Sequence, residues 1–389
     1  MIESPDKLTI SKKREERPVR FIHASDIHLG CQQYQSERRA DDFIKAFKEI
    51  LELAIEKCVD FVILAGDVFT SLEMLPGKLL KIISMLIEFK KNTNERIPII
   101  AIEGNHDIRK FSFGLKLLKR GQSWLKLLSN LGLLILLDAN LDATSVFQYY
   151  DPILRKGGKI QIKNVMIYGI RYIGQEPVDH LPKIRDSIKK EKGVFNILLQ
   201  HYGIEGQMEN VPGVKLEVIN QFKDHVDYLA LGHFHRQFVL DDWIYNPGSS
   251  EAACSIDATF KRGIFFVEVF EGEEFTKNVQ IIRLQNRRHQ WKVLFFPNHS
   301  RNKKEFYNFI MKKLEDFFNC SKLDLKNSND TIPLLHLVLK GKKPMNSCKI
   351  NNKELRNKIY ERFPVLDINI YQKFTNPDVK LDKYIYSYP

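Results

Sequence analysis

Apolar residues in this chain recur with two different periods, and the change from one to the other predicts alternating strands and helices. Short apolar runs typical of buried strands cover residues 19–25, 59–65 and 97–102. Between the first two runs, Asp41 to Lys57 carries apolar residues at helical spacing. After the second run, Pro76 opens a helix that we predict over 76–91, because proline is favoured in a first helical turn. This order predicts a parallel sheet with crossover helices.

A second set of elements follows the first. We predict helices at 115–128, 181–190 and 215–223, and strands at 132–137, 159–171, 194–200, 226–231 and 262–270. These additional strands form a second β-rich layer. The pattern therefore favours an α/β fold in which two sheets form a sandwich flanked by helices.

The composition changes near residue 286 and divides the chain. Residues 1–18, charged at both signs, are expected to be a flexible extension, and residues 19–285 a first domain. The remaining elements are strands at 291–296, 332–340 and 366–372 and helices at 303–318 and 351–362, which predict a smaller α/β domain over 286–389. The aromatic residues of helix 303–318 could stack on bases, but their helical spacing favours a core face.

Positive charge is concentrated in the second domain. Residues 286–389 carry 21 lysine and arginine residues against 10 aspartate and glutamate residues, a net charge of +11, whereas residues 1–285 carry 39 against 38. A polyanion such as DNA is a natural partner for that charge, because cationic side chains gain affinity by displacing phosphate counterions. A solvated basic surface explains the charge alone equally well.

Other compositional features exclude several classes of protein. Hydrophobic residues make up 43% of the chain, as in soluble globular proteins, and no apolar run reaches the length of a membrane span. The first residues lack the apolar stretch of a secretory signal. The five cysteines are scattered, without Cys-x-x-Cys spacing. We therefore expect a cytoplasmic protein with reduced thiols and no zinc site.

Candidate metal ligands follow five of the apolar strand-like runs. The carboxylate, amide and imidazole side chains concerned are Asp26, His28, Asp67, Asn105, His201, His233 and His235. Because ligands collect at the carboxyl ends of strands in such sheets, we expect one site. Donors without thiolate suit Mn²⁺, Fe²⁺ or Mg²⁺, and seven ligands are enough for two ions about 3.5–4 Å apart. Asp67, in the middle strand of the first three, is the predicted bridging ligand.

The third cluster also contains a candidate catalytic residue. His106 lies between Asn105 and Asp107. If Asn105 is a ligand, the next side chain points elsewhere and can stand near a bound phosphate without coordinating. His106 is therefore the predicted general acid or transition-state stabiliser. Asp107 would orient it or anchor the turn.

The five motifs, in this order, resemble the calcineurin-like metallophosphoesterases over residues 19–270. Within that superfamily the chain resembles the SbcD-type nucleases of DNA break repair, also called meiotic-recombination-eleven nucleases. The segments that carry this narrower resemblance are SDIHLG (25–30), RRADDFIKAF (38–47), LAGDVF (64–69), AIEGNHD (101–107), LALGHFH (229–235) and NPGSSE (246–251). The basic second domain resembles the family's capping domain, which covers DNA on the active site.

The resemblance implies a ligand set and a function. It implies one ion held by Asp26, His28, Asp67 and His235, a second held by Asp67, Asn105, His201 and His233, and His106 as the catalytic histidine. It implies two divalent cations, with Mn²⁺ expected, in a 3′ to 5′ exonuclease and single-strand endonuclease. The implied substrates are double-stranded ends, single strands and hairpins of DNA. It further implies a homodimer that works with an SbcC-type coiled-coil ATPase at the nucleoid of a prokaryotic cell. The helices predicted at 76–91 and 115–128 are apolar enough to form that dimer, and core packing explains their apolar residues nearly as well.

Two departures from the family pattern and two alternatives remain open. Thr70 occupies the position where some relatives have a histidine linked to exonuclease activity, so the strength of that activity is open. No C-terminal helical segment for the ATPase is evident after residue 372. One alternative is a phosphoesterase acting on nucleotides or other small phosphodiesters, which would not need a strongly basic domain. The other is an inactive scaffold of the same fold, but such scaffolds tend to lose ligands, and all of them are present here.

Overall fold

The computed structural model describes residues 17–33, 36–108, 123–174, 177–296, 303–320, 332–342 and 350–375. They belong to two compact units. The first comprises Met1–Cys31 and Phe43–Gln285, and the second comprises Gln32–Asp42 and Asn286–Pro389. Almost all of the expected extension 1–18 and most of the predicted helix 115–128 lie outside the described residues. The assignment of residues 32–42 to the second unit was not predicted.

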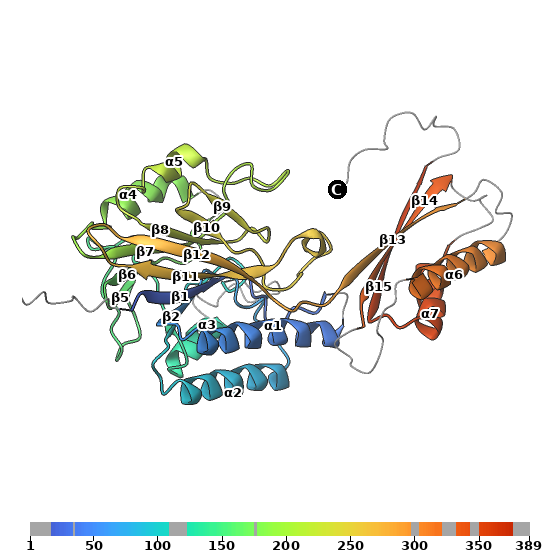
Figure 1. The fold of residues 1–389 in the computed structure, drawn as a ribbon, viewed down its shortest axis with the longest axis horizontal. Helices are drawn as coiled ribbons and strands as arrows, with labels where there is room; N and C mark the ends of the chain where they lie inside the picture. The colour runs from blue at the N-terminus through green and yellow to red at the C-terminus, as the bar shows by residue number, and fades with distance from the viewer. Residues whose placement is uncertain are drawn as a thin grey trace, which may run out of the picture. The chain divides into compact units, whose positions relative to one another are not determined.

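The first unit contains a mixed sheet of six strands (Figure 1). Its order is β12 (Thr276–Arg283), β11 (Gly263–Phe270), β1 (Val19–Ala24), β2 (Phe61–Leu64), β3 (Ile99–Ala101) and β4 (Ile135–Leu136). Strands β1 to β4 are parallel, and β11 and β12 are antiparallel to their neighbours. The outer face packs against α1 (Glu37–Glu56), α2 (Pro76–Asn92) and α3 (Trp124–Asn130).

A second six-stranded sheet packs against the inner face of the first. Its order is β5 (Lys159–Ile162), β6 (Val165–Gly169), β7 (Phe195–His201), β8 (Tyr228–Gly232), β10 (Ile244–Asn246) and β9 (Phe238–Leu240). Its outer face packs against α4 (Leu181–Asp186) and α5 (Leu216–Asn220). Between the sheets, the Phe21 ring stacks on Phe61 at 5.0 Å and meets the edge of Tyr228 at 5.3 Å. The predicted α/β sandwich flanked by helices is confirmed.

Several predicted elements are shorter than expected, and some strands were missed. The predicted strand 132–137 is reduced to β4, and the predicted helix 181–190 ends at Asp186. Strand β12 was not predicted because it is an edge strand with an alternating, largely exposed sequence that gives no continuous apolar run. The short strand β9 lies at the other sheet's edge and was missed for the same reason.

The second unit has the predicted order of strand, helix, strand, helix, strand. Its parallel sheet consists of β13 (His289–Phe296), β14 (Leu334–Lys342) and β15 (Asp367–Thr375). Helices α6 (Lys303–Cys320) and α7 (Asn352–Arg362) both pack on one face of this sheet (Figure 1). Phe306, Ile310 and Leu314 of α6 are buried in that core, so the aromatic helix face is a packing face, as its spacing favoured.

A buried ion-pair network attaches residues 32–42 to the rest of the second unit. Arg287 forms a two-pronged pair with Asp42, with Nε 2.6 Å from Oδ2 and Nη2 2.7 Å from Oδ1. Arg39, fully buried, donates to the same carboxylate and to Gln33. Two guanidinium groups that share one carboxylate are costly to separate from it in a buried site. The network explains why this segment belongs with residues that follow it by more than two hundred positions.

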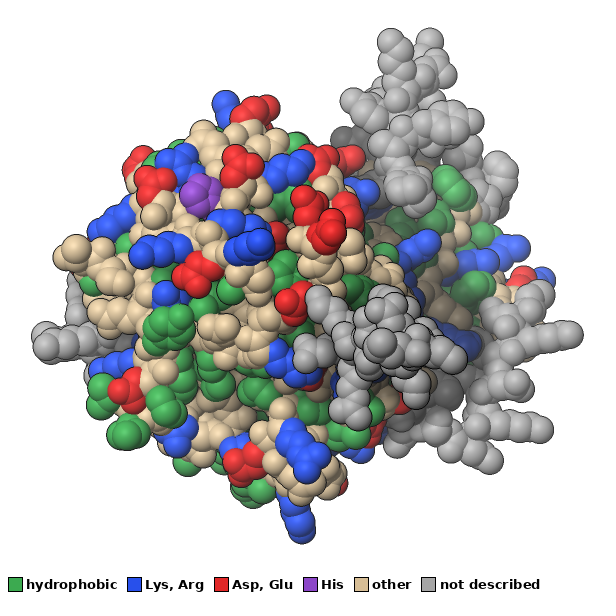
Figure 2. All heavy atoms as spheres, turned by 60° about the vertical axis from the view of Figure 1, so that its left-hand side comes forward, with side chains coloured by type: hydrophobic (Ala, Val, Ile, Leu, Met, Phe, Trp, Pro, Cys, Tyr) green, Lys and Arg blue, Asp and Glu red, His purple; other side chains and the backbone are tan. Residues whose placement is uncertain are grey.

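The surface agrees with the charge distribution of the sequence. Figure 2 shows acidic and basic side chains intermixed over the large body on its left, consistent with the near-neutral charge of residues 1–285.

Within the described ranges, the structure contains no helix with the length and apolar character needed to cross a membrane.

Candidate metal centre

The seven predicted ligands lie at strand ends in both sheets of the first unit. Asp26 and His28 follow β1, Asp67 follows β2, Asn105 follows β3, His201 ends β7, and His233 and His235 follow β8. These are the carboxyl ends of parallel strands, where an α/β sheet leaves room for ligands. The first sheet therefore contributes four of the side chains and the second sheet contributes three.

Four of these residues have an unusual backbone conformation. The φ angles are 50° for Asp26, 52° for His28, 50° for Asp67 and 95° for His233. Non-glycine residues in this region cost about 1–3 kcal/mol each and persist where the surroundings fix them. Here the first two loops fix each other, because the Asp26 N–H donates to the Gly66 carbonyl at 3.1 Å and the His28 N–H donates to the Asp67 carbonyl at 3.0 Å.

Glycines in two of the motifs make room for the side chains of the site. A Cβ atom on Gly104 would lie 2.2 Å from Oδ1 of Asp67. A Cβ atom on Gly66, where φ is +88°, would lie 2.4 Å from Nδ1 of His201. Both motifs therefore need glycine for space, and the Gly-Asp motif needs it for conformation as well.

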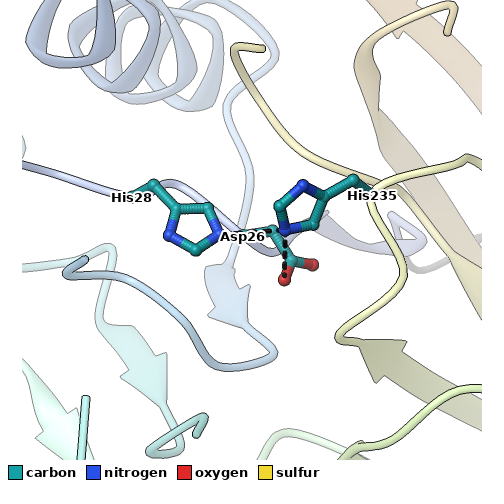
Figure 3. A group of neighbouring side chains, drawn as sticks. All are labelled: Asp26, His28 and His235. Carbon is teal, nitrogen blue, oxygen red and sulfur yellow. Dashed lines mark hydrogen bonds and ion pairs between the residues drawn. The ribbon is translucent and has the colours of Figure 1, made fainter. Parts of the chain in front are cut away.

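Asp26, His28 and His235 form one group of possible ligands (Figure 3). One donor atom from each lies within 4.8 Å of the others. The Nε2 atoms of His28 and His235 are 3.0 Å apart, and Nε2 of His235 is 3.9 Å from Oδ1 of Asp26. Figure 3 shows the three side chains directed toward one another, which is the arrangement that shared coordination of a cation requires.

A second group lies beside the first and shares Asp26 with it. It consists of Asp26, Asp67 and His201, again within 4.8 Å, with Nε2 of His201 3.3 Å from Oδ2 of Asp67. Oδ1 of Asn105 is 3.1 Å from Nε2 of His201 and 3.0 Å from Nδ1 of His233. All seven predicted ligands are thus brought together. Asp26 belongs to both groups, whereas the bridging role of Asp67 stays a prediction.

The electrostatics of the site separate its histidines. Burial lowers the pKa of His28 to about 3 and that of His233 to about 4, so both imidazoles are neutral near pH 7. Neutral imidazole is the form that binds a cation. Burial also opposes protonation of His201, but the Asp67 carboxylate, with help from Asp26 and the Ala65 carbonyl, raises the pKa of His201 to about 9.

The donor set fits divalent cations. Burial raises the pKa of Asp26, and the nearby Asp67 carboxylate raises it further. The carboxylates of Asp26 and Asp67 are buried and have oxygens within 4.8 Å of each other, so they need compensating positive charge. Nδ1 of His28 is buried and has no hydrogen-bond partner within the part of the chain that the structure describes. Oxygen and imidazole donors without thiolate are typical of sites for hard or borderline divalent metals.

His106 lies at the edge of the ligand groups and belongs to neither. Its N–H donates to Oδ1 of Asp67 at 2.7 Å, and its Nδ1 is 3.1 Å from the Thr70 carbonyl. A carbonyl oxygen can only accept, so Nδ1 carries a proton and Nε2 is the atom left for chemistry. The Thr70 hydroxyl donates to the His28 carbonyl at 3.0 Å. Thr70, singled out as a departure from the family pattern, therefore supports both histidines.

Asp107 anchors the turn instead of orienting the His106 ring. It is buried and accepts from three backbone N–H groups, of Val68 at 3.2 Å, Phe69 at 2.8 Å and Gly104 at 2.9 Å. These bonds join the loop after β3 to the loop after β2. The structure thus distinguishes between the two roles that the sequence left open for this residue.

Sequence reasoning missed Asp257, which orients the predicted ligand His235. Its Oδ2 is 2.7 Å from Nδ1 of His235 and accepts the N–H groups of Ala253 at 2.9 Å and Cys254 at 3.0 Å. A carboxylate on Nδ1 places the ring proton there and leaves Nε2 as the ligand atom. Asp257 begins the short 3₁₀ helix η3 (Asp257–Thr259), where no motif marks it. Its contact with His235 is visible only in the folded chain.

Comparison with known proteins identifies the family. The sequence profile of the calcineurin-like phosphoesterases matches residues 19–237. The chain is 31% identical over 245 residues to the DNA double-strand break repair protein Mre11 of Archaeoglobus fulgidus, which covers 60% of this chain and 50% of that protein. It is 30% identical over 228 residues to the Mre11 protein of Methanococcus maripaludis, covering 56% and 52%. It is 24% identical over 370 residues to the Mre11 protein of Saccharolobus solfataricus, covering 91% and 81%. The chain thus spans about half the length of the first two relatives.

Proposed function

Because the chain belongs to the calcineurin-like phosphoesterase family, we propose that it is a metal-dependent phosphodiesterase that cleaves DNA in double-strand-break repair. The observation that carries the proposal is the convergence of seven oxygen and imidazole donors from both sheets on one site, with His106 beside them. The similarity to proteins named for DNA double-strand break repair supports DNA as the substrate.

The proposed ligand assignment is the one that the family resemblance implies, with Asp67 as the bridging ligand, whereas the two groups of side chains in the structure share Asp26. One cation would be held by Asp26, His28, Asp67 and His235, and the other by Asp67, Asn105, His201 and His233. We propose Mn²⁺ for both, since the donors are carboxylate, amide and imidazole. When bound, two such ions supply positive charge opposite a phosphodiester and lower the pKa of a water molecule.

His106 performs the proton chemistry in this proposal. The Thr70 carbonyl fixes the proton on Nδ1, so that a second proton on Nε2 can be given to the leaving oxygen. The backbone N–H of His106 bonds to Asp67, which ties the position of this ring to that of the proposed bridging ligand. A shift of Asp67 would therefore displace the catalytic group as well.

The test of the proposal uses purified protein with Mn²⁺ and end-labelled double-stranded DNA. Wild-type protein should shorten or nick the DNA. His106→Ala should lower the rate by about 10²- to 10⁴-fold, the usual contribution of a general acid or base. A matched control is His225→Ala. His225 lies just before β8, and its ring contacts the Ile188 carbonyl at 3.1 Å instead of any predicted ligand. If neither protein cuts DNA but the wild type hydrolyses a small phosphodiester, the repair-nuclease proposal fails and the phosphoesterase assignment survives.

The finer properties of the proposed enzyme rest on the resemblance. We propose 3′ to 5′ exonuclease and single-strand endonuclease activity, a homodimer, and an SbcC-type coiled-coil ATPase as partner, at the nucleoid of a prokaryotic cell. Leu80 and Ile87 of α2 are exposed and offer apolar surface for the dimer. Sedimentation velocity on the wild type and a Leu80→Glu, Ile87→Glu double variant tests this surface, because charges there should yield a monomer.

A further inference from the structure

The two faces of the β13–β15 sheet are chemically different. Side chains alternate between the faces of a strand. On one face, apolar residues of the sheet pack against α6 and α7. On the opposite face β13 presents Trp291, Val293 and Phe295, which are 42%, 42% and 68% exposed. Helices α6 and α7 lie on the other face, and these three apolar side chains remain in contact with solvent.

The rings on this open face are held in a fixed orientation. Trp291 stacks on His336 with ring centres 4.1 Å apart and planes within 11°. The Tyr371 ring lies 5.9 Å from Trp291 with planes within 14°. Asn369 donates to the Tyr371 hydroxyl at 2.6 Å, and that hydroxyl is 3.5 Å from Nδ1 of His336. Parallel rings fixed by hydrogen bonds lose little conformational freedom when a planar ligand stacks on them.

Positive charge lies beside the aromatic rings. Lys340 is the β14 partner of Phe295, and its Nζ is 5.9 Å from the centre of the Phe295 ring. Lys373 is the β15 partner of Lys340 and is exposed. The surrounding residues 286–389 carry a net charge of +11. Lys340 and Lys373 therefore continue, across the three strands, the row that begins with Phe295.

We propose that this aromatic face, defined by Trp291, Val293, Phe295, Lys340 and Tyr371, binds single-stranded DNA by stacking bases on its rings. Aromatic platforms beside cationic groups are the chemistry of single-strand binding, because unpaired bases offer their faces and the adjacent phosphates offer negative charge. A duplex hides its base faces, and lysine is depleted from protein–protein interfaces. The inference deepens the proposed function and rests on it for the choice of DNA as the polymer.

The first test compares two ligands with the same phosphates. Fluorescence anisotropy of the full chain, with EDTA present to prevent cleavage, is measured with a labelled oligothymidylate and with an abasic oligonucleotide of equal length. The wild type should bind oligothymidylate about 5- to 100-fold more tightly, the range expected for stacked bases. Phe295→Ala, at a highly exposed position, should remove most of that preference. Phe270→Ala, at a 40% exposed position of β11 in the first unit, is the matched control and should retain it.

A second readout does not depend on lost affinity. Oligothymidylate should quench tryptophan fluorescence in the wild type, and Trp291→Phe should keep the affinity while losing most of the quench. Trp243 is buried and cannot stack on a base. Equal wild-type affinity for the two ligands would overturn the proposal, as would an undiminished preference in Phe295→Ala. Dissociation of a dimer by Phe295→Ala with unchanged DNA preference would make the face a protein interface and also refute it.

The design separates this inference from the proposed function. Hydrolysis of a small phosphodiester with Mn²⁺ is measured in the wild type and in Phe295→Ala. The two rates should be equal, because the aromatic face lies in the second unit and the ligands lie in the first. If the wild type prefers oligothymidylate but hydrolyses no phosphodiester, the proposed function is refuted and the DNA-binding role of the aromatic face is supported. If the wild type cuts DNA but binds the two oligonucleotides equally, the proposed function is supported and the DNA-binding role of the aromatic face is refuted.

Discussion

Replacing Asp257 by asparagine tests whether the carboxylate behind His235 supports metal binding. The asparagine side chain would keep the size of the original one and an oxygen for the three N–H groups, from His235, Ala253 and Cys254, that now meet Oδ2. The negative charge is lost, together with the acceptor for the Cys254 thiol, which now lies 3.0 Å from Oδ1. The surrounding backbone should therefore stay in place while the His235 ring becomes a weaker ligand.

The magnitude follows from the geometry of that contact. The 2.7 Å distance between Nδ1 of His235 and Oδ2 of Asp257 is that of a charge-assisted hydrogen bond, about twice as strong as a neutral one. Burial disfavours charge on both groups, but their mutual interaction raises the pKa of His235 and lowers that of Asp257. Loss of such a partner behind a metal-binding histidine costs about 10- to 100-fold in affinity, or about 1.4–2.7 kcal/mol.

The assay is a titration of the protein with Mn²⁺, followed by the electron paramagnetic resonance signal of the free ion. Asp257→Asn should shift the curve to about 10- to 100-fold higher Mn²⁺ for the weakened site. The matched control is Asp227→Asn, which changes a carboxylate that accepts the Asn196 N–H at 2.8 Å near the start of β7, away from the ligands. An unchanged titration in a folded Asp257→Asn protein would refute the reasoning, and so would equal losses in the two variants.

Three further predictions concern the site, the second unit and the core. Gly104→Ala would place a Cβ 2.2 Å from Oδ1 of Asp67, so we expect about 1–3 kcal/mol lower stability and weaker Mn²⁺ binding, measured by urea unfolding and the same titration; unchanged values would contradict the steric argument. Asp42→Asn removes the negative charge shared by two buried arginines. We expect about 3–5 kcal/mol lower stability and faster proteolysis of residues 286–389. Glu52→Gln, at an exposed position of α1, is the control and should have no effect. Burial lowers the pKa of His23 from 6.5 to about 3, so the unfolded chain takes up this proton first as the pH falls, and stability should decline from about pH 6.5 downward. His23→Gln should flatten that decline in urea unfolding measured at several pH values, and an identical slope would exclude the contribution.

The positions of the candidate ligands could be predicted from the sequence because each one follows an apolar run. Buried parallel strands are marked by such runs, and the residues just past them must lie at the carboxyl edge of a sheet. Asp26 and Asp67 are therefore placed at the same edge of one sheet, and His201 at the carboxyl end of its own strand, without knowledge of the full fold. Asn105 contacts His201 and His233 across the two sheets. This contact depends on how the sheets pack, which the sequence pattern does not determine.

Other features had no local signal. Residues 32–42 belong to the second unit because Asp42 pairs with Arg287, a contact over 245 positions that no periodicity reveals. Asp257 lies 22 residues after His235, in a segment without strand or helix pattern. Both cases are buried charge pairs. Such pairs form wherever the fold brings opposite charges together. Because the sequence contains many acidic and basic residues, it does not indicate which of them will pair.

The supports of the site explain why a motif identifies ligands more readily than it identifies their partners. Asp26, His28, Asp67 and His233 adopt φ values that cost free energy in an isolated loop. Much of what holds these loops comes from residues with no role as ligands: Asp107 accepts three backbone N–H groups, and Asn246 donates to the Phe234 and Arg236 carbonyls at 2.7 and 2.8 Å on either side of His235. These bonds join protein groups to one another and involve none of the predicted ligand side chains. Substitutions at these supports should therefore change metal affinity before they change the fold.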